Sequence, residues 1–378
     1  MSSAKRRNAL IAFMLVLTVF GSLSCSKKSQ GGGSLPPLQF RTQVCIDRSG
    51  TGIEAFRMLV PKEWTFEGGI RWVLDNPGMP ATASLRARNP SNGAEFEVFP
   101  NQPFFWTDNQ MHRQMFPVGS RYYGNEVRPP LGPIDALKKI VLARFRQGVR
   151  GLKVLKEEHL PELAKTVGAG ASAQPGVRAS ADGARIRIAY DRKGTPVEEE
   201  IYGVVESYGF PIQSMYGSFT NTIWTVDYLF SFKAEKGKLD SMAIVFRTIV
   251  SSFRVNPQWY NKYTQVVEYL IKAQIQKIRS VGELSKIISR THNEISDEML
   301  RSFEDRQAAY DRISEKFSQQ IRDVDAYYSP VEGRSIELPG GYRQAWTNNL
   351  GDVVLSEAED FNPNIGSNQN WQKMEKKE

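Results

Sequence analysis

The chain has 378 residues, of which 40% are hydrophobic and 24% charged, so it is composed like a globular protein that can bury a sizeable core. Its formal net charge is +8, with 49 Lys and Arg residues against 41 Asp and Glu residues, and no long basic run carries the surplus. The sequence therefore argues against nucleic acid as a partner.

The first 24 residues are arranged like a secretory signal peptide. Three basic residues at positions 5–7 precede an apolar stretch over residues 9–20, and small or apolar residues then lead to Cys25. A permanent transmembrane helix needs about 20 apolar residues, more than this stretch provides. The pattern predicts export followed by cleavage.

The end of this segment, Ser22-Leu23-Ser24-Cys25, resembles a bacterial lipobox, in which the cysteine receives lipid and becomes the new N-terminus. Ser22 stands where Leu is usual, and an ordinary signal followed by an unrelated cysteine is the alternative. The resemblance implies a protein held on the cell envelope by lipid on Cys25. Ser26 resembles the pattern that directs Gram-negative lipoproteins to the outer membrane, facing the periplasm.

Residues 25–40 contain three consecutive glycines and two prolines, which predicts a flexible tether. Strand and helix patterns then follow up to residue 255. An amphipathic helix is predicted to begin at Pro133 and to end before Gly148. Short strands are predicted at Phe56–Val60, Ala83–Arg88 and Glu95–Phe99.

A surface loop is predicted at residues 168–183, which are rich in Ala, Gly and Ser. Strands are expected next at Ala184–Tyr190, Val197–Tyr208 and Thr222–Lys233, with a hairpin turn at Asp191–Thr195. A second amphipathic helix is expected at Leu239–Phe253.

Helices that flank antiparallel strands argue for an α+β domain over residues 41–255, with one sheet covered by helices. The strand at Phe56–Val60, its continuation Pro61-Lys62-Glu63-Trp64 and the closing helix at Leu239–Phe253 resemble the MOG1/PsbP-like fold. The resemblance covers residues 45–255 and implies an αβα sandwich that serves as a binding or assembly module without shared catalytic residues. We expect this domain to fold alone.

Residues 256–328 are predicted to form a long helical or coiled-coil hairpin. Phe303, Tyr310, Phe317 and Val324 are spaced seven apart, and Thr291-His292-Asn293-Glu294 matches a helix-capping box. The alternative is one long rod that forms a homodimer through residues 257–328. Beyond the helices, residues 329–361 predict a small β-hairpin module with a turn at Asn349–Asp352, and residues 362–378 a disordered tail.

Residues that carry chemistry are sparse. The three histidines, His112, His159 and His292, are dispersed without metal-ligand spacing, so no metal or cofactor is predicted. Cys45 has no intramolecular partner if Cys25 is acylated. The run Glu198-Glu199-Glu200 is interpreted as a solvated strand edge in preference to catalytic carboxylates.

An aromatic-rich segment between Phe96 and Tyr123 is the one candidate site for a ligand or protein partner. The alternative is that its rings pack beneath a long loop. We favour a non-enzymatic binding or assembly protein that engages another envelope protein. The second hypothesis is a cell-envelope hydrolase, acting on glycan or peptide, whose carboxylates meet only in the fold. The candidate binding residues are Phe104, Phe105, Trp106, Tyr122 and Tyr123.

Overall fold

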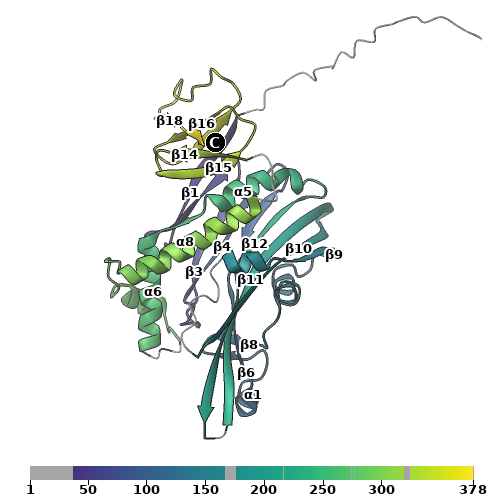
Figure 1. Cartoon of the computed structure of the whole chain (residues 1–378), viewed down its shortest axis with the longest axis vertical. Helices are drawn as coiled ribbons and strands as arrows, with labels where there is room; N and C mark the ends of the chain where they lie inside the picture. Colours follow the sequence, from purple (N-terminus) through teal and green to yellow (C-terminus); the bar gives the residue numbers. More distant parts are fainter. Residues whose placement is uncertain are drawn as a thin grey trace, which may run out of the picture. The chain divides into compact units, whose positions relative to one another are not determined.

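The structure is a computed structural model that describes residues 37–166, 176–215, 217–273, 275, 277–318 and 324–377. The predicted signal peptide and Cys25 lie outside these residues. Residues 36–378 form one compact unit, and strands predominate in the fold, with 45% strand against 24% helix (Figure 1). In the described residues, no helix combines the length and apolarity needed to cross a membrane.

The largest sheet is built around a meander of long antiparallel strands. Its order is β3-β4-β5-β12-β11-β10-β9. The two-residue turn between β10 and β11 uses Lys193 and Gly194, both left-handed at φ +54° and +88°, which matches the twist of the flanking strands. The predicted hairpin is confirmed. The bounds are β3 (Thr65–Trp72), β4 (Ala81–Arg88), β5 (Glu95–Val98), β9 (Arg150–His159), β10 (Arg178–Arg192), β11 (Thr195–Ser214) and β12 (Gly217–Glu235).

One edge of β12 is shared by two short strands. β5 pairs with Phe230–Lys233, and β6 (Gln102–Thr107) pairs with Asn221–Val226. The interruption between β5 and β6 lies opposite a bulge in β12, where the pairing with β11 shifts register. Two further short strands, β7 (Arg121–Tyr122) and β8 (Asn125–Val127), and the helix α1 (Gln110–Met115) complete this end of the sheet.

Each face of this sheet is covered by one of the predicted amphipathic helices. The first consists of α2 (Pro133–Ala136), a π-helical turn (Leu137–Leu142) and α3 (Ala143–Phe145), and its stripe packs on β10, β11 and β12. The second is α5 (Ala243–Ser251), which follows a 3₁₀ turn (Asp240–Met242) and packs into the core on the other face, as does α4 (Pro161–Thr166). Both helices were predicted within a few residues of their observed ends.

A second sheet joins the two ends of the described chain. Its order is β13-β2-β1-β17-β16-β18, so the predicted C-terminal hairpin is completed by β1, with Leu38 opposite Leu355. The range predicted as a disordered tail contains β18 and β19, and Met374 between them is buried. A third sheet has the order β15-β14-β19. The bounds are β1 (Leu38–Ile46), β2 (Glu54–Pro61), β13 (Arg254–Val255), β14 (Val324–Ser329), β15 (Arg334–Pro339), β16 (Gln344–Asn348), β17 (Val353–Ser356), β18 (Trp371–Lys373) and β19 (Glu375–Lys377).

The predicted αβα sandwich followed by a long helical or coiled-coil region is wrong. The described part of residues 256–328 holds three separate helices and then the start of β14. The helices are α6 (Pro257–Lys272), α7 (Val281–Ile288) and α8 (Asp297–Ser318). The apolar face of α8 instead packs on the rest of the fold: the Tyr310 ring lies against the rings of Phe253, which follows α5, and Tyr228 in β12, with centroids 4.9 Å and 5.3 Å away. Helix spacing predicted an apolar face without predicting what covers it.

The helix starts also differ from the predicted capping box at Thr291–Glu294. Ser280 caps α7 by accepting a hydrogen bond from the Glu283 amide at 3.1 Å, and Glu283 accepts one from the Arg279 amide. Ser296 caps α8 in the same way, through the Met299 amide at 3.3 Å. The predicted loop at residues 168–183 lies partly outside the described residues, and its last six residues form the start of β10.

Candidate functional site

Two of the predicted aromatic binding residues belong to the hydrophobic core. Phe104 is 0% exposed and stacks on Trp224 across the β6–β12 pair, with ring centroids 4.3 Å apart. Phe105 is buried and contacts Tyr122 with the same centroid separation. Both residues are buried in strand β6, so their rings are packed in the core as the alternative held, although a strand pair and not a long loop provides the packing.

The other three predicted aromatic residues lie nearer the surface. Trp106 is half-buried, with the Arg113 guanidinium 5.6 Å from its ring centroid. Tyr122 is also half-buried, whereas Tyr123 is 51% exposed. Tyr123 and Gly124 are left-handed, and a Cβ at Gly124 would lie 2.1 Å from the Asp75 carbonyl oxygen. The turn therefore holds the β7–β8 hairpin against residues 75–76.

A buried network of charges occupies the sheet face that carries α3. Alternation along paired strands places Glu95, Glu97, Glu199 and Lys233 on this face, and Arg146 reaches them from the end of α3. Arg146 binds Glu97 at 2.6 Å and Glu199 at 2.8 Å, while Lys233 binds Glu95 at 2.6 Å. Glu199 is 0% exposed, so the interpretation of Glu198–Glu200 as a solvated edge is wrong.

Two carboxylates of this network, Glu97 and Glu199, have a lowered pKa. Burial alone would raise the pKa of Glu97 and of Glu199, but the nearby charges of Arg146 and Lys233 lower the pKa of both. Tyr190 donates a further hydrogen bond to Glu199 at 2.9 Å. Acids whose charges are satisfied by buried cations are poorly suited to catalysis, and we interpret this network as structural.

A cleft of about 360 Å³ opens beside this network, where β3 and β4 approach the β5–β6 connection and the β7–β8 hairpin. Three arginines line it and define what we call the arginine cleft: Arg71 from β3, Arg121 from β7 and Arg144 from α3. Glu126 is the one acid among the lining residues. The cleft therefore carries a surplus of positive charge.

The three arginines differ in how they are held. Arg144 is paired with Glu126 and Gln102, and its guanidinium lies 5.4 Å from the Phe104 ring centroid. Arg121 donates to the Gly124 carbonyl at 2.8 Å and lies 3.5 Å from the Asp75 carboxylate. Arg71 is exposed, and its guanidinium has no hydrogen-bond or ion-pair partner within the described ranges. Its guanidinium is free to bind an anion.

Asn101 lines the arginine cleft and also bonds Asp227, which forms a pair of neighbouring carboxylates with Glu206. The Asn101 amide donates to Asp227 at 2.8 Å, and Arg306 of α8 donates to the other Asp227 oxygen at 3.1 Å. Glu206 lies diagonally across the β11–β12 pair from Asp227. The bulge at this point gives Tyr228 a left-handed φ of +48°, a strained conformation for a tyrosine.

Glu206 has the most chemically suggestive carboxyl in the described chain. Burial, followed by the nearby charge of Asp227, raises the pKa of Glu206 to about 7, although Arg306 opposes the shift. A carboxyl with a pKa near neutral pH beside a second carboxyl is an arrangement found in acid–base sites.

We expect Glu206→Gln to flatten the pH dependence of stability between pH 4.5 and 7. The folded pKa of Glu206 is raised from its ordinary 4.5, so the folded form keeps its proton in this window while the unfolded form loses it. Stability therefore falls as pH rises, and the variant should be roughly 1–3 kcal/mol more stable at pH 8. Urea unfolding at several pH values tests this. Glu67→Gln, at a 73% exposed position, should behave like the parent.

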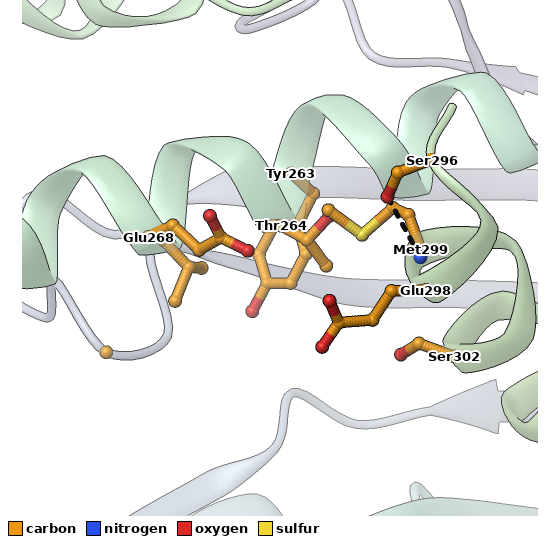
Figure 2. A pocket seen from close by; sticks show the side chains of 9 residues that line it. Tyr263, Thr264, Glu268, Ser296, Glu298, Met299 and Ser302 are labelled. Atoms are coloured by element: carbon orange, nitrogen blue, oxygen red, sulfur yellow. Dashed lines mark hydrogen bonds between the residues drawn. The ribbon is translucent and has the colours of Figure 1, made fainter. Parts of the chain in front are cut away.

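A second cavity, of about 300 Å³, lies between α6 and α8 (Figure 2). Glu268 and Glu298 project toward it from the two helices, and Thr264 donates to the Met299 sulfur at 2.8 Å. Both carboxylates are exposed, and Glu268 is paired with Lys272 at 3.4 Å. This cavity lacks the cationic lining of the arginine cleft, and we do not assign it a function.

The structure assembles a site that the sequence analysis did not find. Arg71, Arg121 and Arg144 come from three separate elements, and only the fold brings them together. Asp227 did leave a signal, because an acid inside the apolar strand Thr222–Lys233 needs a polar partner. Across the described residues, no three His, Cys, Asp or Glu side chains are grouped to hold a metal ion. Cys45 is buried, and burial raises the pKa of its thiol.

A scan against models of known protein families finds no match to this chain, and a search of the curated proteins finds no similar sequence.

Proposed function

We propose that this chain is a lipid-anchored cell-envelope protein that binds an anionic ligand in the arginine cleft and catalyses no reaction. The single observation that carries the binding proposal is the unpartnered Arg71 beside Arg121 and Arg144. A guanidinium in a concave site binds carboxylate or phosphate oxygens in a bidentate manner.

The size and lining of the arginine cleft support this proposal. Its volume of about 360 Å³ is at the lower end of the range for small-ligand sites, which suits one acidic sugar or a short phosphate chain. Thr82, Ser84 and Asn76 add neutral hydrogen-bonding groups to the lining. Such groups orient a polar ligand after the arginines have attracted it.

The experiment that tests the binding proposal compares Arg71→Gln with Arg88→Gln by titration calorimetry. Arg71→Gln should weaken binding of tripolyphosphate or tetragalacturonate by about tenfold, because it removes one charge-assisted interaction. Arg88 ends β4 and is not part of the lining, so its variant should bind like the parent. The phosphate and carboxylate probes separate the two chemical sources of negative charge.

A second candidate function, hydrolysis of an envelope glycan or peptide, is favoured by Glu206 alone. Its pKa of about 7 suits a general acid, and Asp227 would be the second carboxyl of the pair. The bonds that Asn101 and Arg306 donate to Asp227 are equally consistent with a structural role. We therefore rank this function second.

The anchoring part of the proposal rests on the sequence, in which basic residues 5–7 and the apolar stretch 9–20 precede Cys25. It implies a location on the envelope, at the outer membrane facing the periplasm in a Gram-negative host. Cys25→Ala should abolish labelling by a fatty-acid probe and release the protein into a high-salt wash. Cys45→Ala should keep the label, since Cys45 is buried in the fold. Full labelling of Cys25→Ala would contradict the anchor.

A further inference from the structure

The β11–β12 hairpin extends beyond the strands that flank it (Figure 1). β10 stops opposite Gly209 and β6 stops opposite Asn221, whereas β11 and β12 pair as far as Ser214 and Gly217. The five residues of β11 after Gly209 project by roughly 16 Å at about 3.3 Å per residue. The end of the hairpin therefore lacks a neighbouring strand within the described ranges.

This projecting end is apolar and carries no charge. Residues 207–224 contain no Asp, Glu, Lys or Arg. Met215 at the turn is 95% exposed, and α1, which contacts the hairpin through the His112–Phe219 pair, adds Met111 and Met115. We call these three methionines, together with Phe210 and Ile223, the apolar tip. Their exposed fractions are 69% for Met111, 64% for Met115, 37% for Phe210 and 42% for Ile223.

The edges of the hairpin are unsuited to pairing with a strand of another protein. Pro211 removes one backbone donor from the free edge of β11. On β12, the Thr220 amide donates to the Asp108 carboxylate at 2.6 Å, and the Thr220 carbonyl accepts from the Asp108 amide at 3.2 Å. These features are the ones that proteins use to block edge-to-edge association.

The charged residues around the apolar tip indicate what kind of surface it binds. Arg113 on α1 and Arg178, opposite Gly209 at the start of β10, are both exposed where the uncharged segment begins. The exposed Asp108, bonded to Thr220, is an acid in the same place, so the basic side chains named here outnumber it two to one. An uncharged apolar end with a net positive charge behind it matches a bilayer whose anionic headgroups cover an apolar interior. Methionine and aromatic side chains adapt to such a boundary.

We propose that the apolar tip inserts into the headgroup–acyl boundary of an anionic lipid bilayer. The strand edges at the tip still carry backbone polar groups, which the hydrocarbon interior does not tolerate, so insertion stays shallow. Met215, Met111 and Met115 enter the boundary while Arg113 and Arg178 contact the headgroups. This contact is separate from the arginine cleft and does not depend on the proposed ligand.

Vesicle flotation tests the proposal with residues 36–378, the compact unit that lacks the lipidation site. The probes are vesicles of phosphatidylcholine and phosphatidylglycerol at three to one, and vesicles of phosphatidylcholine alone. The parent should float with the anionic vesicles and more weakly with the neutral ones. Met215→Asp and Met115→Asp should each reduce binding by about tenfold. Leu350→Asp, at a 65% exposed position on the β16–β17 turn, should bind like the parent.

Three results would overturn the proposal. The parent fails to float with anionic vesicles, Met215→Asp and Met115→Asp float like the parent, or Leu350→Asp loses as much binding as they do. A thermal melt confirms that each variant is folded, which is expected because the substituted side chains are exposed. The apolar tip could instead bind a second copy of the chain, and sedimentation equilibrium tests this. If the parent forms a dimer, Met215→Asp dissociates it and no vesicle binding is seen, the tip is a dimer interface and the proposal is wrong.

Discussion

Arg146→Ala is expected to lower the free energy of unfolding by about 3–5 kcal/mol, because it removes the cation from a buried ion pair. Arg146 is 8% exposed and bonds both Glu97 and Glu199. Its loss leaves Glu97 with Arg86 at 2.9 Å and Lys233 at 3.4 Å, and takes from the fully buried Glu199 the arginine to which it is bonded. The neighbouring Arg150 is exposed at the start of β9, and Arg150→Ala should change stability by less than about 0.5 kcal/mol.

The cause of this loss of stability can be isolated by also neutralising the two carboxylates that Arg146 binds. Adding Glu97→Gln and Glu199→Gln to Arg146→Ala should recover part of the lost stability, because neutral amides cost less to bury than unpaired carboxylates. Chemical denaturation at pH 7 measures all of these variants. A loss below about 1 kcal/mol for Arg146→Ala would show that water reaches the network and that it is not buried in solution.

A chain that ends at Val255 is expected to lose cooperative unfolding. This result would contradict the expectation that residues 41–255 fold alone. β17 pairs with β1, and residues from beyond 255 pack on Phe40 and Leu59 in one cluster. Five of the removed side chains are fully buried, and at about 1.5–3 kcal/mol each they are together comparable with the whole stability of a typical domain. These five are Tyr327, Ile336, Leu338, Val353 and Leu355.

The truncated chain also loses part of the main core. Ala309 of α8 is 0% exposed in the cluster that contains Phe246 and Phe232, and Tyr310 packs against it. Circular dichroism melts of residues 37–255 and 37–377 provide the comparison. A sharp, reversible transition in the shorter chain, with near-ultraviolet signal intact, would show that residues 41–255 form an independent domain.

Local patterns were sufficient to predict the elements whose partners are adjacent in the chain. The helix after Pro133 has an apolar stripe that meets the sheet built from β10, β11 and β12, and each of these strands was predicted. Short-range periodicity carries this information because neighbouring strands pair through tight turns. The Asn349–Asp352 turn was predicted for the same reason.

Contacts between distant segments could not be predicted in this way. No local signal in β1 shows that its partner, β17, lies more than 300 residues away, and a hydrophobic strand pairs with any matching edge. The seven-residue spacing of Phe303 and Tyr310 predicted a coiled coil, but this face of α8 packs against Tyr260, Tyr228 and Phe253. Periodicity identifies an apolar face and leaves its covering surface open.

The arginine cleft was missed for the same physical reason. Arg71, Arg121 and Arg144 are ordinary surface arginines in the sequence, and their convergence depends on the break between β5 and β6 opposite the β12 bulge. The rings of Phe104 and Phe105 were visible in the sequence but proved to be core residues. Aromatic clusters show burial more often than binding, because large rings supply most of a core.

Titration calorimetry of the chain with tetragalacturonate and with tripolyphosphate, at low and at high salt, tests the central claim that the arginine cleft binds an anionic ligand. We predict saturable binding at one site per chain for at least one probe, weaker at high salt, about tenfold weaker in Arg71→Gln and unchanged in Arg88→Gln. No saturable binding, equal binding by Arg71→Gln, or the release of new reducing ends from tetragalacturonate would contradict it.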